Sequence, residues 1–227
     1  MSELFEKQQY ATTNREYEQY AIQYTDPDDE LMVELVRRTH LSFTTASMLS
    51  GVLQGRLLKM ICAMLNAETV LEIGTYTGYS SIYMARGMAD HGILHTIDNN
   101  QEVADIVEEF VNRADLNEKI KAYQGNALEV IPSVIFPALT KPLDMVFIDA
   151  DKENYIAYYE LCIEKVRKGG FLLVDNTLWY GRVFDESAYN DKETKGIIAF
   201  NNHIKQDNRV EKLLLPIRDG LMILRKI

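Results

Sequence analysis

The sequence of 227 residues predicts an α/β fold with a mostly parallel sheet and helices on both faces. From about Glu68 onward, apolar runs of strand length alternate with segments of helical period, which is typical of such a fold. The residues before that point show helical patterns only. No linker, repeat or low-complexity tract interrupts the chain, so we expect one domain over residues 1–227. Within it, residues 1–67 would form a helical cap and residues 68–227 the core.

The alternating region predicts five strands and four helices. The strands are expected at Thr69–Ile73, Ile93–Ile97, Ile120–Gln124, Leu143–Ile148 and Phe171–Val174. The helices are expected at Tyr79–Ala89, Glu102–Ala114, Ala127–Ile135 and Ile156–Val166. In the last helix, a buried stripe is predicted from residues at helical spacing, namely Ile156, Tyr159, Ile163 and Val166. Lys168-Gly169-Gly170 would then stop the helix before the next strand.

The two ends of the chain depart from simple alternation. Helices are predicted at Asp29–Arg38 and Val52–Leu65, the second with Leu53, Leu57, Ile61 and Leu65 at every fourth position. At the other end, the short turn Arg218-Asp219-Gly220 joins strand-like runs at Val210–Ile217 and Leu221–Arg225. So short a connection predicts a hairpin, and therefore an antiparallel strand in the sheet.

Composition narrows the classes of partner. There are 24 Lys and Arg residues against 34 Asp and Glu residues, giving a formal net charge of −10. Such a chain repels phosphate backbones and anionic membrane surfaces, so no nucleic-acid partner and no membrane partner are expected. A small neutral or cationic substrate remains compatible with the charge.

Cysteine usage and the absence of long apolar runs predict a cytoplasmic protein. Cys62 and Cys162 lie in apolar helical segments without a CxxC or Cys/His cluster, which indicates buried thiols in a reducing compartment and no zinc site. The N-terminal stretch is polar, and nowhere do about 18 uncharged apolar residues run together. We therefore expect neither a signal peptide nor a membrane span.

A glycine-bearing turn follows the first strand of the alternating region. Gly74 and Gly78 in this turn would let the backbone approach a ligand outside the carboxyl end of the strand. The spacing is not GxGxxG and no phosphate-binding Lys-Ser/Thr follows, so the loop favours a cofactor without a pyrophosphate. Glu72 at the strand end could attract the amino group or sulfonium of S-adenosylmethionine. Asp98, which ends the second strand, could accept hydrogen bonds from ribose hydroxyls, and Gly125-Asn126-Ala127 could line an adenine edge.

Acidic residues follow the next two strands. Asp149 comes directly after the fourth strand, and Asp175-Asn176 directly after the fifth. Neighbouring parallel strands lie about 4.8 Å apart, so these side chains can converge on one point. Two carboxylates and an amide oxygen suit a hard cation, Mg²⁺ first and Mn²⁺ or Ca²⁺ as alternatives. The alternative interpretation, that Asp149, Asp151 and Lys152 only cap the next helix and pair on the surface, is disfavoured by Asp175-Asn176 at the next strand end.

A divalent ion at this place would explain how a phenol becomes a nucleophile. A phenol with a pKa of about 10 is unreactive at neutral pH. Coordination stabilises the phenolate and orients its oxygen toward a methyl donor. Lys152, three residues beyond Asp149, is the candidate base for the phenolic proton.

These motifs resemble the metal-dependent O-methyltransferases of the catechol and caffeoyl-CoA type, in particular their bacterial and plant small-molecule branch. The resemblance extends from about Thr45 to the C-terminus and rests on Leu71–Ser80, Val146–Tyr155, Asp175–Trp179 and Leu215–Ile227. It implies a Rossmann-like class I methyltransferase fold with a seven-stranded sheet. It also implies that S-adenosylmethionine and a divalent metal are the cofactors, and that the acceptor is a catechol-like hydroxyl. A homodimer is implied in the same way.

The resemblance assigns roles to particular residues. It implies metal ligands at Asp149, Asp175 and Asn176, and catalytic roles for Lys152 and Asp149. The implied cofactor contacts are Met48, Ser50, Glu72, Gly74, Tyr76, Tyr79, Ser80, Asp98, Ala127, Asp149 and Tyr155. The chain departs from the plant enzymes at Val52-Leu53-Gln54, where those enzymes carry an acidic residue.

The remaining aromatic residues and histidines are less informative. Trp179 and Tyr180 follow the Asp-Asn pair, where they could stack on a flat substrate, although Trp179 could equally close the core. The polar segment Gly181–Thr194 is expected to form a loop over the site. The N-terminal tyrosines are interpreted as packing or dimer contacts: Tyr10, Tyr17, Tyr20 and Tyr24. No chemistry is assigned to His40, His91, His95 or His203.

Four other functions compete with this interpretation. A nicotinamide-dependent oxidoreductase is disfavoured by the missing GxGxxG fingerprint and by the terminal hairpin. A methyltransferase acting on nucleic-acid amines is disfavoured by charge, and by Asp-Asn-Thr-Leu-Trp in place of an Asn/Asp-Pro-Pro-aromatic stretch. A catalytically silent cofactor-binding protein stays open, although the ligand positions and Lys152 are all present. A methyltransferase with a non-catechol acceptor also stays open.

Overall fold

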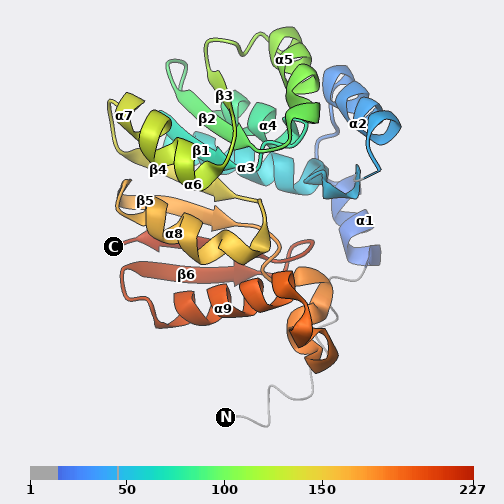
Figure 1. The fold of residues 1–227 in the computed structure, drawn as a ribbon. Coiled ribbons are helices and arrows are strands. Elements are labelled where there is room, and N and C mark those ends of the chain that lie inside the picture. Colours follow the sequence, from blue (N-terminus) through green and yellow to red (C-terminus); the bar gives the residue numbers. More distant parts are fainter. Residues whose placement is uncertain (1–14, 45) are drawn as a thin grey trace.

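The computed structural model, described for residues 15–44 and 46–227, is built on one seven-stranded sheet (Figure 1). The strand order is β3-β2-β1-β4-β5-β7-β6, in which β1 to β5 are parallel and β7 runs antiparallel to both of its neighbours. The bounds are β1 Thr69–Ile73, β2 Ile93–Asp98, β3 Ile120–Gln124, β4 Leu143–Ile148, β5 Val166–Val174, β6 Val210–Leu215 and β7 Leu221–Lys226. The predicted α/β class, the parallel strands and the antiparallel hairpin are confirmed.

The register of the parallel strands brings four strand ends to one edge of the sheet. Ile73 at the end of β1 pairs with Ile97 of β2 and with Ile148 of β4. Ile148 in turn pairs with Val174 of β5. The residues that follow these ends therefore start from the same level, at the place where parallel sheets bind ligands.

Helices cover both faces of the sheet, as Figure 1 shows. One face carries α2 Glu30–Ser42, α3 Gly51–Leu65, α4 Tyr79–Gly87 and α5 Ala104–Arg113. The other carries α6 Ala127–Val130, α8 Tyr155–Ile163 and α9 Lys192–Gln206. The short α1 Arg15–Gln23 precedes α2, and α7 Phe136–Ala138 precedes β4. Short helical segments complete the chain: η1 Ala46–Met48, η2 Gln101–Val103, η3 Ile131–Ile135, η4 Lys152–Asn154, η5 Trp179–Phe184 and η6 Glu186–Asn190.

The expected stop at Lys168-Gly169-Gly170 is wrong, because these residues lie inside β5. Helix α8 already ends at Ile163, and Val166 is a strand residue paired with Leu143. The register shifts between Leu143 and Met145, and a Cβ on Gly170 would lie 2.9 Å from the Asp144 carbonyl oxygen. The glycine therefore serves a bulge within the strand, which competes with the helix-stop interpretation of the same residue type.

The apolar residues at every fourth position of α3 lie at the edge of the buried face of this helix and not at its centre. Leu53, Leu57, Ile61 and Leu65 are only half-buried, whereas the fully buried positions are Gln54, Gly55, Leu58 and Cys62. A polar side chain, Gln54, thus points into the protein from this helix. Both cysteines are buried and free, as predicted. Among the helices described, none has the length and apolar character needed to cross a membrane.

Candidate active site

A cavity of about 990 Å³ opens at the edge where the parallel strands end. Its wall includes most of the residues predicted to bind a cofactor or metal: Met48, Ser50, Gly74, Tyr76, Tyr79, Ser80, Asp98, Ala127, Asp149, Lys152, Asp175 and Asn176. Glu72 and Tyr155 are buried outside it. The fold therefore places most of the predicted site residues around one cavity, whereas Glu72 and Tyr155 are buried and do not line it.

The turn after β1 brings the backbone close to the end of β4. Gly74 has φ +104°, and a Cβ at this position would lie 1.9 Å from the Asp149 carbonyl oxygen. Only glycine fits such an approach, so the turn depends on this residue. The backbone N–H of Tyr76 then donates to Asp98 Oδ2 at 2.7 Å, and that of Asn100 donates to Oδ1 at 2.8 Å. Two neutral donors thus fix the Asp98 carboxylate while it still faces the cavity.

Glu72 is fully buried beneath this turn. Its carboxylate accepts hydrogen bonds from Ser80 at 2.5 Å, from Thr96 at 2.6 Å and from Ser81. Burial raises the pKa of Glu72 to about 7, although the three hydroxyl donors act in the opposite direction. In this structure Glu72 ties β1 to β2 and α4, and direct contact with a cofactor stays a prediction.

Two tyrosines of the predicted cofactor set differ in position. The Tyr79 hydroxyl donates to both oxygens of Asp28 at 3.0 Å, which links α4 to the segment before α2 while the residue still lines the cavity. Tyr155 is fully buried, and its hydroxyl has no hydrogen-bond partner among the described residues. The centroid of its ring lies 5.0 Å from Lys152 Nζ, so Tyr155 packs against the lysine on the side away from the cavity.

The acidic half of the site lies past β4 and β5. Asp175 is 5% exposed, and its carboxylate accepts hydrogen bonds from Gln54 Nε2 at 2.7 Å and from the Asn176 backbone at 2.8 Å. Burial, together with the nearby charge of Asp149, raises the pKa of Asp175 to about 7. Asn176 has φ +58°, a left-handed conformation that asparagine tolerates better than most residues.

Lys152 lies directly beside Asp149, one of the two acids in this half of the site. It is 7% exposed, and its Nζ is 3.1 Å from Asp149 Oδ1 and 5.5 Å from the Trp179 ring centroid. The Trp179 ring is itself 5.3 Å from that of Tyr180, which is 71% exposed, and both residues line the cavity. The Lys152 amine thus lies between the Asp149 carboxylate and the rings of Trp179 and Tyr155 at the cavity wall.

The donor set at the end of β4 and β5 fits a hard divalent cation. Asp149, Asp175 and Asn176 offer two carboxylates and an amide oxygen on one cavity wall. Within the described part of the chain, the hydrogen bonds to the buried Asp175 carboxylate come from neutral groups. A buried carboxylate without a directly bound cation is the arrangement that a metal ion would stabilise.

The chain also matches known proteins over nearly its whole length. The O-methyltransferase family matches residues 22–227. The chain belongs to the O-methyltransferase family. This membership confirms the enzyme class predicted from the sequence, an S-adenosylmethionine-dependent O-methyltransferase.

Individual relatives support this assignment. A Dictyostelium discoideum protein described as probable caffeoyl-CoA O-methyltransferase 2 is 35% identical over 208 residues, covering 92% of this chain and 90% of the relative. Caffeoyl-CoA O-methyltransferase 1 of Eucalyptus globulus is 32% identical, over 77% and 73% of the two chains. Among solved structures, the Bacillus cereus O-methyltransferase in complex with SAH has a TM-score of 0.81 at 30% identity, covering 92% and 96%.

Two polar residues that contact the acidic half of the candidate site were not predicted from the sequence. Gln54 was noted only as a departure from the plant enzymes, and Asp219 only as part of a turn. Asp219 Oδ1 accepts the Tyr180 backbone N–H, and Oδ2 lies 3.5 Å from Asn176 Nδ2. A glutamine on the buried face of an apolar helix was the one available signal for Gln54, since buried polar groups need partners.

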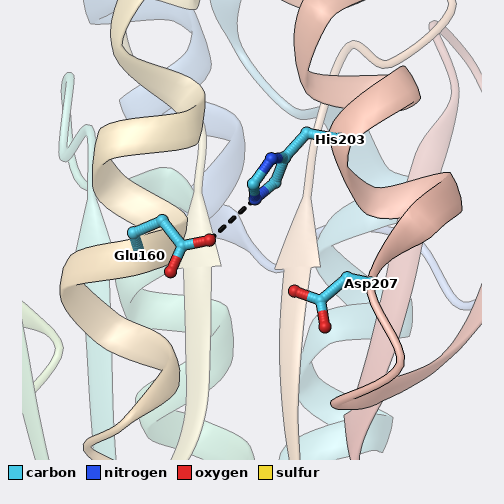
Figure 2. Close-up of side chains that lie close together, drawn as sticks. All are labelled: Glu160, His203 and Asp207. Atoms are coloured by element: carbon cyan, nitrogen blue, oxygen red, sulfur yellow. Dashed lines mark hydrogen bonds and ion pairs between the residues drawn. The ribbon is translucent and has the colours of Figure 1, made fainter.

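A second group of acids lies away from the cavity, on α8 and near the end of α9. Figure 2 shows His203 directed toward Glu160, with Asp207 nearby, and ligand atoms of all three lie within 4.8 Å of one another. The Arg209 guanidinium donates to Glu160 Oε1 at 2.7 Å and to Asp207 Oδ2 at 2.6 Å. A side-chain cation therefore already balances these carboxylates, and the cluster is an ion-pair network linking α8, α9 and β6.

Proposed function

We propose that this O-methyltransferase transfers the methyl group of S-adenosylmethionine to one hydroxyl of a catechol-like small molecule, with the help of a divalent metal. Mg²⁺ is the proposed ion, and Mn²⁺ or Ca²⁺ are alternatives. The observation that carries the proposal is the buried Asp175, which shares a cavity wall with Asp149, Asn176 and Lys152. Residues 1–67 and 68–227 are proposed to act as one catalytic unit, because both contribute to this wall.

The cofactor is proposed to occupy the side of the cavity nearest β1 and β2. Asp98 would accept hydrogen bonds from the ribose, and Gly74 would admit the cofactor close to the backbone. The other proposed contacts are Met48, Ser50, Tyr76, Tyr79, Ser80 and Ala127, all of which line the cavity. Relatives solved with SAH or SAM support the choice of cofactor, among them TomG of Streptomyces achromogenes at 26% identity.

The proposed chemistry is an in-line displacement. A divalent ion held by Asp149, Asp175 and Asn176 would lower the pKa of an aromatic hydroxyl at neutral pH. In its neutral form Lys152 Nζ accepts the hydroxyl proton, and the ammonium that results is stabilised by Asp149 Oδ1 at 3.1 Å. The hydroxyl oxygen forms a bond to the methyl carbon as the bond from that carbon to sulfur breaks, and S-adenosylhomocysteine leaves. Trp179 and Tyr180 would stack on the acceptor ring and hold it in line.

The charge of the cavity wall favours an acceptor without phosphate groups. Seven carboxylates occur on its described part, against the two cationic side chains Lys152 and Arg218: Glu18, Asp98, Asp149, Asp151, Asp175, Glu193 and Asp219. A cofactor with a sulfonium and a divalent ion would offset part of this charge but leave the wall acidic. A neutral or cationic catechol therefore fits the wall better than an anionic thioester.

The decisive experiment is methyl transfer from S-adenosylmethionine to a panel of catechols, measured with Mg²⁺ and with EDTA. The panel includes a neutral catechol, an amine-bearing catechol and caffeoyl-CoA. Transfer that requires the metal supports the proposal. Equal transfer in EDTA removes the metal role, and calorimetric binding of S-adenosylmethionine without transfer to any acceptor favours a silent paralogue or a non-catechol acceptor.

A homodimer and a cytoplasmic location are proposed as well. Met60 and Met64 on α3 are 61% and 74% exposed, which leaves an apolar surface for a second copy. The N-terminal tyrosines Tyr17, Tyr20 and Tyr24 are also exposed, and Tyr10 lies outside the described residues. Buried free thiols support a reducing compartment. Sedimentation at micromolar concentration tests the dimer, and a monomer there would contradict it.

A further inference from the structure

Gln54 connects the N-terminal helices to the acidic half of the site. It lies on α3, is 2% exposed, and donates from Nε2 to Asp175 Oδ2 at 2.7 Å across 121 residues of sequence. The other fully buried positions of α3 are Gly55, Leu58 and Cys62, so Gln54 is the one polar side chain among them. The buried amide of Gln54 on this helix therefore contacts the carboxylate of Asp175.

We propose that Gln54 is a positioning residue that holds Asp175 ready for a divalent cation. This inference rests on the metal role proposed above. Each carboxylate oxygen has two acceptor positions. Asp175 Oδ1 uses one on the Asn176 backbone N–H and Oδ2 uses one on Gln54, so each oxygen keeps a second position for a metal.

The neutral charge of the Gln54 amide is the property that matters. A cationic side chain in its place would hydrogen-bond Asp175 but also balance its charge, as Arg209 does for Asp207. An amide orients the carboxylate and leaves its negative charge available to the ion. Hydrogen bonds of this kind to ligating carboxylates commonly change metal affinity by about 10- to 100-fold.

Two substitutions separate this role from simple filling of the interior. Gln54→Met keeps the approximate length and volume but removes the donor. Gln54→Lys keeps a donor and adds a charge. If Gln54 only fills space, Gln54→Met keeps the metal affinity of the wild type. Under the positioning role both lose it, and the lysine variant loses more.

The test is calorimetric titration of each folded variant with Mn²⁺ alone, with S-adenosylmethionine binding and thermal melting as checks on the fold. Gln54→Met is expected to bind Mn²⁺ about 10-fold more weakly, with S-adenosylmethionine affinity within about twofold of wild type. Leu57→Met, on the half-buried side of the same helix, is the matched control and should change neither affinity. If Gln54→Lys does not fold, the methionine variant alone decides.

The outcomes distinguish this inference from the function on which it rests. Wild-type affinity for Mn²⁺ in Gln54→Met overturns the positioning role and leaves the metal proposal intact. If wild type and Asp175→Asn titrate identically with Mn²⁺, the metal proposal itself fails and the role of Gln54 falls with it.

Discussion

The two acidic clusters of this protein contain similar residue types and differ in the source of their positive charge. Around Asp207, the Arg209 guanidinium supplies the charge through hydrogen bonds of 2.6–3.1 Å, and the Tyr159 hydroxyl adds a bond of 2.7 Å. Around Asp175, the hydrogen-bond donors are an amide and a backbone N–H. Lys152 lies closest to the other acid of the pair, Asp149. The positive charge of Arg209 directly balances the carboxylate of Asp207, whereas no hydrogen bond from a cation balances that of Asp175 among the described residues.

The pKa directions follow from this difference. Hydrogen bonds from Arg209 hold the pKa of Asp207 well below its ordinary range, and they also lower that of Glu160. Burial and the charge of Asp149 raise the pKa of Asp175 to about 7. Spatial closeness of ligand atoms alone selects the cluster of Glu160, His203 and Asp207 as a metal site, whereas the balance of charge favours the cavity, where we propose the metal.

Removing one acid from each cluster should give the largest difference in activity between the two clusters. We expect Asp175→Ala to reduce metal-dependent methyl transfer by about 100-fold or more, because a metal contributes several kcal/mol to stabilising developing charge. Binding of S-adenosylmethionine should persist in calorimetry. The matched variant Asp207→Ala should keep the specific activity of the folded enzyme and lose about 1–3 kcal/mol of unfolding free energy in urea titration. A reversal of these two phenotypes would contradict the assignment.

Lys152 is the proposed general base and lies 3.1 Å from Asp149 Oδ1. Lys152→Ala should lower kcat at neutral pH by about 10²- to 10⁴-fold, as expected for loss of a general base, with a much smaller change in KM for the acceptor. Steady-state kinetics at saturating S-adenosylmethionine measure both. Lys152→Arg is the control that retains positive charge but not a proton acceptor, so it should be impaired as well. Unchanged kcat in the alanine variant would remove Lys152 as the base.

Much of the candidate site could be predicted because it follows strand ends. Asp98 ends β2, Asp149 and Asp175 come directly after β4 and β5, and parallel pairing alone places such residues at one edge. Local pattern was therefore enough to specify a long-range arrangement. The same reasoning located the glycine turn at Gly74, because a close backbone approach restricts the residue type.

The parts that were missed depend on contacts between distant elements. Glu72 lies one residue before the end of β1, and the enclosure of its side chain by α4 and β2 depends on packing that the local pattern does not specify. Its contact with a cofactor stays a prediction. Gln54 reaches Asp175 only because α3 packs beside the sheet. Glycine at position 170 has two compatible roles, a helix stop and a strand bulge, and pairing with β4 selects the second. Tertiary packing decides each of these cases.

The raised pKa of Asp175 predicts how pH should affect metal binding. Between its ordinary value of about 3.9 and about 7, the folded protein without metal keeps a proton that the unfolded chain has released, so this carboxyl's contribution to stability falls as pH rises. A metal ion takes the place of that proton. The rise in melting temperature caused by Mn²⁺ should therefore be small at pH 5.5 and reach a plateau above pH 7. Apparent affinity at pH 6 should be about 10-fold below the plateau.

Glu72 provides the internal control for this pH experiment. Its pKa is also raised to about 7, so the contribution of Glu72 to the free energy of unfolding falls as pH rises over the same range. This fall occurs with or without metal. Only the part of the pH dependence that requires Mn²⁺ should vanish in Asp175→Asn. A Mn²⁺ effect on melting temperature that is constant from pH 5.5 to 8 would show that Asp175 does not exchange a proton for the ion.

The smallest expected effect comes from removing the cation of the balanced cluster. Arg209→Met should lower the free energy of unfolding by about 1 kcal/mol, because Arg209 and Glu160 are 40% and 39% exposed and solvent replaces much of their interaction. Asp207 keeps the Tyr159 hydroxyl and a backbone donor, which limits the loss further. Urea titration at pH 7 measures the change, and the loss should shrink at low pH, where the carboxylates are protonated. A much larger loss, or a loss of methyl transfer per folded molecule, would mean that this cluster supports the active site and is not only an ion-pair network.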